Sequence, residues 1–164
     1  MNFMKLFEIQ NVLDNRIIKD RGLQEYNLTE ERILALLVEI GECTNEVRSF
    51  KFWSDKLPSE REVILEEFVD CLHFILSIGN NTGLAFDHIT KLRIIEESGD
   101  INSLFIEFFH SVTDFRNNKT EVRYITIFNY FVTIANRLWF TQEEIINAYM
   151  EKNAINHERQ EQGY

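Results

Sequence analysis

Residues that interrupt helices are scarce in this chain of 164 residues. The sequence holds one proline, Pro58, and six glycines, and the alternation of apolar and polar side chains that is typical of strands is nearly absent. Apolar side chains instead recur three and four residues apart, as they do along one face of a helix. We therefore predict an all-α fold, a helical bundle. Because 45% of the residues are hydrophobic and no linker divides the chain, we expect residues 1–164 to form a single domain with a sizeable core.

Capping and turn signals divide the chain into successive helices. Ser59 with Glu62, and Thr141 with Glu144, match the capping box that starts a helix. The predicted helices are one that fades near Gly22, one that Asn27 or Thr29 caps and that ends before residues 50–58, one from Ser59 to about Asn80, a short one over 86–97, one from Ile101 to about Phe115 that Asp100 caps, one over 121–139, and one that begins after Thr141.

Charge and hydropathy argue against two kinds of partner. A formal net charge of −10 does not suit a nucleic-acid surface, since phosphate binding depends on clustered Lys and Arg. The most apolar run, residues 124–140, contains Asn129, Asn136 and Arg137 and is shorter than the ~20 residues of a membrane span, so we predict a buried helix there. The N-terminus lacks the apolar core of a signal peptide. We expect the two cysteines to be reduced residues of the core. We expect a cytoplasmic protein that binds neither nucleic acid nor membrane.

Two apolar stretches are interrupted by carboxylates at helical spacing. Glu39 and Glu42 lie three residues apart, as do Glu67 and Asp70, so each pair shares one face of a helix. Two such helices, joined by a short turn, would pack antiparallel and could direct four carboxylates at one another. Without a cation these groups would repel each other and raise one another's pKa. Because Mg²⁺ prefers six oxygen ligands, the carboxylates predict a magnesium site that a polyphosphate substrate completes.

Two other interpretations of these carboxylates remain open. Either pair by itself is common on a solvated helix face. A four-helix di-iron site would also use carboxylates, but it expects Glu-x-x-His pairs. Neither Glu39 nor Glu67 has a histidine three residues on, whereas His73 follows Asp70 at that spacing. The di-iron interpretation is therefore the weaker one.

The C-terminal segment carries a different kind of group. Lys152, Asn156 and Arg159 follow one another at four and three residues, on one face of the last predicted helix, and Tyr164 ends the sequence. Cations on one face in an otherwise acidic protein suit phosphate oxygens. The alternative is an ordinary solvated helix with cations near its negative end.

Four segments together resemble a known family. They are EIGE at 39–42, NEVRSFKFWS at 45–54, EEFVDCLHF at 66–74 and KNAINHERQEQGY at 152–164. In combination they are similar to the dimeric, all-α dUTPase family, a branch of the all-α nucleotide pyrophosphatases. The region 101–140 carries no motif that matches this family.

The resemblance implies an activity and a set of site residues. The activity is hydrolysis of dUTP, with dUDP as a further candidate substrate, to dUMP by a Mg²⁺-dependent homodimer. Glu39 or Glu42 would also orient or deprotonate the attacking water. The matching residues in this sequence are Glu39, Glu42, Glu67 and Asp70 as Mg²⁺ ligands, Phe74 as the aromatic that stacks on uracil, Trp53 and Gln10 in the base pocket, and Lys152, Asn156, Arg159 and Tyr164 at the phosphates and sugar.

The sequence leaves two other functions open. A related pyrophosphatase of another nucleotide, such as dCTP, would share the carboxylate helices and differ only in its base pocket. A non-catalytic helical binding or regulatory protein would need neither all four carboxylates nor the cationic C-terminal segment. Trp53 and Phe74 could be ordinary core aromatics, and His73 either contacts the sugar or packs beside the site. Whether a repressor or other protein partner binds is also open.

Overall fold

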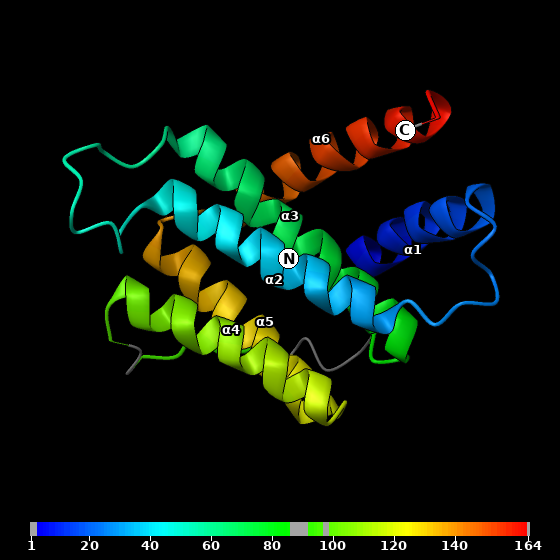
Figure 1. Ribbon diagram of the computed structural model, residues 1–164, viewed down its shortest axis with the longest axis horizontal. Helices are drawn as coiled ribbons and strands as arrows, with labels where there is room; N and C mark the ends of the chain where they lie inside the picture. The colour runs from blue at the N-terminus through cyan, green and yellow to red at the C-terminus, as the bar shows by residue number, and fades with distance from the viewer. Residues whose placement is uncertain (1–2, 86–91, 97–98, 164) are drawn as a thin grey trace.

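The computed structural model describes residues 3–85, 92–96 and 99–163, and within these residues it contains six α-helices and no strand (Figure 1). The all-α prediction is therefore confirmed. The helices are α1 (Phe3–Asp20), α2 (Thr29–Val47), α3 (Arg61–Thr82), α4 (Ile101–Asn117), α5 (Glu121–Arg137) and α6 (Gln142–Glu161).

The helix pair α2 and α3 forms the centre of the bundle. Figure 1 shows the pair running side by side, with α4 and α5 on one side and α1 and α6 on the other. Helix α3 contacts α1, α2, α5 and α6, whereas α2 contacts α3 and α4. The two carboxylate-bearing helices are thus neighbours, as the sequence predicts, and α1 and α6 lie beside α3 on the same side of the bundle.

Aromatic side chains hold α3 against α5. The rings of Phe68 and Phe131 stack with centroids 4.3 Å apart, and the hydroxyl of Tyr124 donates to the carbonyl of Ile75 at 2.7 Å. A Cβ atom at Gly79 would lie 2.1 Å from the Tyr124 hydroxyl oxygen, so a residue with a side chain would force the two helices apart. Gly79 thereby permits the close approach that buries this hydroxyl.

Two predicted helix caps are confirmed. The Asp100 side chain accepts a hydrogen bond from the backbone N–H of Ser103 at 2.8 Å. Thr141 and Glu144 form the complete capping box at the start of α6. At α2 the side chain of Asn27 accepts from the backbone N–H of Thr29 at 3.1 Å, so of the two predicted caps Asn27 is the one whose side chain acts, although helix α2 has Leu28 at its N-cap position.

Two predictions about the helices are wrong, one about a cap and one about a short helix. Ser59 does not cap α3, because Glu60 holds the N-cap position without a side-chain hydrogen bond and the Ser59 hydroxyl instead donates to the carboxylate of Glu46. A tertiary partner has displaced the local one. In the predicted short helix over 86–97, residues 92–96 are not helical, and the remainder of that segment lies outside the described residues.

The predicted buried helix over 124–140 corresponds largely to α5, which ends at Arg137. Phe128 and Phe131 of this helix are fully buried. None of the helices in the described part of the chain is both long and apolar enough to cross a bilayer. Cys43 and Cys71 are buried free thiols, in agreement with the prediction of reduced core residues.

Candidate active site

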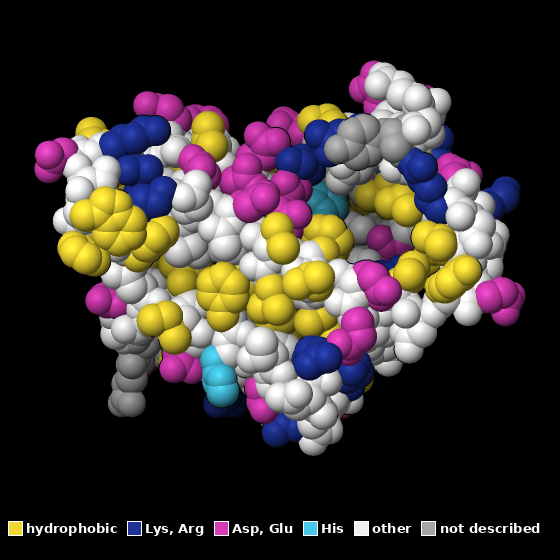
Figure 2. All heavy atoms as spheres, in the orientation of Figure 1, with side chains coloured by type: hydrophobic (Ala, Val, Ile, Leu, Met, Phe, Trp, Pro, Cys, Tyr) yellow, Lys and Arg dark blue, Asp and Glu magenta, His cyan; other side chains and the backbone are white. Residues whose placement is uncertain are grey.

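A pocket of about 410 Å³ lies between α1, α2, α3 and α6. Figure 2 shows it as a hollow in the molecular surface, with acidic side chains gathered at one edge and basic side chains nearby. Most of the residues predicted from the sequence meet here, although they come from both ends of the chain. The lining side chains are Gln10, Leu13, Asp14 and Ile17 from α1, Glu39 and Glu42 from α2, Glu67, Asp70, His73, Phe74 and Ser77 from α3, and Lys152, Asn156, Arg159 and Gln160 from α6.

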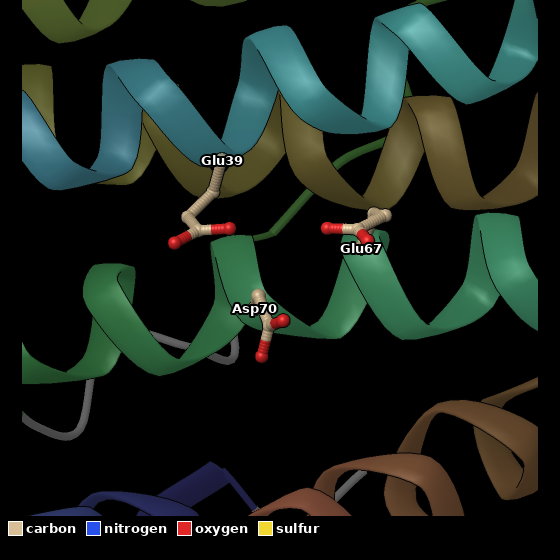
Figure 3. A group of neighbouring side chains, drawn as sticks. All are labelled: Glu39, Glu67 and Asp70. Carbon is tan, nitrogen blue, oxygen red and sulfur yellow. The ribbon is translucent and has the colours of Figure 1, made fainter. Parts of the chain in front are cut away.

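Three carboxylates form a cluster at the acidic edge. Glu39 reaches from α2 toward α3, which carries Glu67 and Asp70 (Figure 3). One oxygen from each of the three lies within 4.8 Å of the others. Glu42, the fourth predicted ligand, lines the same pocket but is not a member of this cluster. The cluster arises because α2 and α3 pack against each other and each carries acidic residues on the face turned to the pocket.

The carboxyl groups of the cluster hold protons more tightly than usual. Burial, together with the charges of the neighbouring carboxylates, raises the pKa of Glu39 to about 7. Burial also raises the pKa of Glu67, with the negative charge of Asp70 as the next cause. A cation among these groups would replace protons and relieve their repulsion. Since every donor is a carboxylate oxygen, the set suits a hard cation such as Mg²⁺.

Lys152 supplies an internal cation to the acidic edge. Its Nζ lies 2.6 Å from Asp70 Oδ2 and 2.8 Å from Glu66 Oε1, and its side chain is only 12% exposed. Burial raises the pKa of Asp70, although the hydrogen bond from Lys152 lowers it. Asn156 and Arg159 line the pocket farther along α6. The cationic face of α6 is therefore turned toward the pocket instead of being solvated throughout.

Aromatic and amide side chains form the opposite part of the pocket. The His73 ring stacks on Tyr149 with centroids 4.2 Å apart, and its Nδ1 lies 2.8 Å from Oε1 of Gln10. Burial, followed by the positive charge of Lys152, lowers the pKa of His73 to about 3, so the ring is neutral near pH 7. Phe74 also lines the pocket. This region offers an aromatic ring and an amide, the groups that stack on and hydrogen-bond to a nucleobase.

One predicted site residue, Trp53, is not brought to the pocket. Trp53 lies in the loop between α2 and α3, where it is 65% exposed and packs edge-on against Phe50 and Phe52. The loop leaves α2 through Arg48, which adopts a left-handed conformation with φ of 60°. Tyr164 lies outside the described residues. The roles of both stay predictions from the resemblance.

Sequence reasoning missed three polar residues that line the pocket: Asp14, Ser77 and Gln160. Asp14 lies four residues after Gln10 and accepts a hydrogen bond from its Nε2 at 2.8 Å. That spacing places both on one face of α1, so the signal was present in the sequence. Burial raises the pKa of Asp14, while hydrogen bonds from Ser77 and Gln10 and the charge of Arg32 lower it.

Comparison with known proteins identifies the family of this chain. The sequence model of the family described as dUTPase matches residues 2–164. A search of the curated proteins found no match. The match covers the helices that carry the carboxylate cluster and the cationic face of α6, and the all-helical fold agrees with it. The chain therefore belongs to the all-α dUTPase family and is a dUTP diphosphatase.

Proposed function

We propose that this protein hydrolyses dUTP to dUMP and pyrophosphate with Mg²⁺ held by Glu39, Glu67 and Asp70. The observation that carries this proposal is the cluster of three carboxylates, with oxygens within 4.8 Å of one another, in a pocket that also contains Lys152 and Arg159. When bound, Mg²⁺ supplies positive charge that offsets the negative charge developing on the phosphate oxygens. The pocket thus offers charge of both signs where a triphosphate and its cation would lie.

The remaining residues of the pocket have separate tasks in this proposal. Glu42 lines the pocket outside the carboxylate cluster, so its carboxylate is available to accept the proton of the attacking water. Lys152 and Arg159 donate hydrogen bonds to phosphate oxygens. As the substrate enters, the ammonium group of Lys152 gives up its hydrogen bond to Asp70 for one to a phosphate oxygen. Asn156, beside Arg159 on α6, contacts the sugar or a phosphate.

Uracil recognition is assigned to the part of the pocket between α1 and α3. Phe74 would stack on the base, and the amide of Gln10 would hydrogen-bond to its edge. Trp53 and Tyr164 remain candidates for the base and for the sugar or phosphates respectively. The pocket does not by itself exclude dUDP, which carries the same base and sugar.

The identity of the products tests the reaction type. Chromatography of a dUTP digest is expected to show dUMP and pyrophosphate in equal amounts. If dUDP and phosphate appeared instead, the terminal phosphate would be the group removed, and the proposed cleavage to dUMP and pyrophosphate would be wrong.

The raised pKa values predict a pH-dependent stabilisation by Mg²⁺. The pKa of Glu39 in the folded, metal-free protein is about 7, above its usual value, so protonated Glu39 stabilises the fold at low pH and this contribution is lost as pH rises through about 7. Mg²⁺ competes with that proton. The rise in melting temperature on adding Mg²⁺ should therefore be larger near pH 8 than near pH 6, by about 3 °C or more.

Glu39→Gln provides the control for this measurement, because glutamine cannot ionise. In that variant the pH dependence of the Mg²⁺ effect should shrink. An equal effect of Mg²⁺ at both pH values in the unmodified protein would remove Glu39 from the proposed metal site.

We propose that a second copy of the chain covers the exposed apolar face of α2 and α4. Leu34 and Val38 of α2 and Ile106 of α4 are 63%, 48% and 65% exposed, and Figure 2 shows apolar side chains in a band across this face. Burying such a band between two copies removes it from water.

The two buried thiols, Cys43 and Cys71, fit a reducing compartment, and we place the enzyme in the cytoplasm.

Ile106→Glu is expected to shift the protein from dimer to monomer, because a carboxylate would then be buried in the proposed interface. Light scattering after gel filtration measures the mass directly. Val122→Glu is the matched control, since Val122 is 73% exposed and belongs to α5 instead of α2 or α4. If Ile106→Glu stayed dimeric, another surface would form the dimer.

A further inference from the structure

The amide of Gln10 is held by groups from three helices. Gln10 itself is 4% exposed. Its Nε2 donates to Oδ1 of Asp14 on the same helix at 2.8 Å. Its Oε1 accepts from the hydroxyl of Tyr149 on α6 at 2.9 Å and lies 2.8 Å from Nδ1 of His73 on α3. Asp14, Tyr149 and His73 are therefore all at hydrogen-bonding distance from the amide.

Of these three neighbours, only Asp14 makes one of the two orientations of the amide lower in free energy than the other. The Tyr149 hydroxyl can donate or accept, and a neutral imidazole can carry its proton on either nitrogen. Both would tolerate a rotated amide. Burial raises the pKa of Asp14, whereas hydrogen bonds from Ser77 and Gln10 and the charge of Arg32 lower it. In its ionised form the carboxylate of Asp14 only accepts hydrogen bonds. An amide oxygen turned toward it would meet negative charge with no proton between them, so Nε2 must face Asp14.

This orientation also fixes the proton on His73. Because Oε1 of Gln10 faces Nδ1, the nitrogen must donate, and the lone pair lies on Nε2. Among the described residues, Nε2 of His73 is buried without a hydrogen-bond partner, so no acceptor there holds the proton on this nitrogen. Rotating the amide would reverse this, since Nδ1 would then accept from Gln10 and Nε2 would carry the proton.

The orientation matters for the base. One hydrogen on Nε2 of Gln10 is engaged by Asp14, and no other acceptor for this nitrogen lies among the described residues. The second hydrogen suits a carbonyl oxygen, which uracil has at C4. Cytosine has an amino group there, so an amide N–H would face another donor, and a carbonyl would be needed instead.

We propose that Asp14 is a positioning residue that sets the donor and acceptor ends of the Gln10 amide, and through them the preference for uracil over cytosine. This inference rests on the proposed function in its second part only. The first part, the orientation of Gln10 and the proton on His73, is a property of the free protein.

The first arm of the test measures the histidine proton without substrate. In protein with ¹⁵N-labelled histidine, the wild-type His73 spectrum is expected to show a protonated Nδ1 and an unprotonated Nε2. Asp14→Asn, which is close to isosteric, should shift His73 toward the other tautomer, because either end of the Gln10 amide can then face residue 14. Asp20→Asn is the matched control: Asp20 also lies on α1 but pairs with Arg16 at 3.6 Å, and it should leave the spectrum unchanged.

The second arm compares kcat/KM for dUTP and dCTP. In Asp14→Asn the ratio between the two substrates is expected to fall at least about tenfold, mainly through KM, with no such change in Asp20→Asn. A wild-type His73 that carries its proton on Nε2 would overturn the proposal, even if the variant failed to fold. So would a folded variant in which either the tautomer or the ratio stayed as in wild type. If the wild type cleaved neither nucleotide, the proposed function would fail, and the first arm would still decide the role of Asp14.

Discussion

Glu67→Gln is expected to lower kcat for dUTP hydrolysis about a thousandfold, because it removes a charged ligand from the carboxylate cluster. The same change should raise the melting temperature in EDTA. Glu67 has a raised pKa because it is buried near other carboxylates, and a neutral amide in its place relieves that repulsion. Loss of activity together with a gain in metal-free stability is typical of replacing a metal ligand. Replacing a residue that merely supports the fold would lower both the activity and the stability.

The matched control for this prediction is Glu62→Gln. Glu62 is an exposed residue of the same helix and lies outside the carboxylate cluster. This variant carries the same change in charge, and its kcat should stay within about twofold of wild type. Full activity in Glu67→Gln would mean that the cluster is not the metal site.

Lys152→Met is expected to lower kcat/KM for dUTP about 10- to 100-fold, because one charge-assisted hydrogen bond to phosphate is lost. It should also lower the melting temperature in EDTA by about 5 °C. The Nζ of Lys152 lies 2.6 Å from Oδ2 of Asp70, and both side chains are mostly buried, at 12% and 14% exposed. Removing the lysine leaves the Asp70 carboxylate unpaired beside other carboxylates.

Mg²⁺ should restore much of the stability that Lys152→Met loses, since a bound cation can replace the ammonium group near Asp70. Lys119→Met is the control, because Lys119 pairs with Glu30 at 3.5 Å on an exposed surface and should change neither property. If Lys152→Met bound dUTP as tightly as wild type, Lys152 would serve only to neutralise the cluster.

The helices could be predicted from the sequence because their signals are local. Apolar periodicity and two glycine- and proline-poor stretches suffice to identify α2 and α3. The capping boxes show where local signals fail: Thr141 and Glu144 form theirs, but Ser59, in the same pattern, donates to Glu46 instead. Nothing within a few residues of Ser59 indicates that the end of α2 folds back beside it.

The site was predictable where its residues share a helix face. Helical spacing identified the carboxylates and the face of Lys152, Asn156 and Arg159, and the fold brings both sets to the same pocket. Asp14 was missed although its helical spacing from Gln10 was visible, because a single carboxylate on an amphipathic helix looks solvated. Only the packing of α1 against α3 and α6 shows that the pair faces a pocket. Trp53 lies in a loop whose path depends on contacts that no sequence pattern describes.

Pyrophosphate release from each common deoxynucleoside triphosphate and from UTP, first with Mg²⁺ and then with EDTA, tests the central claim most directly. Release from dUTP alone, abolished by EDTA, is the predicted result, and it would establish the base, the sugar and the metal requirement together. Equal release from dCTP would contradict the assignment of uracil to the pocket between α1 and α3. Release that persisted in EDTA would contradict the metal site formed by Glu39, Glu67 and Asp70.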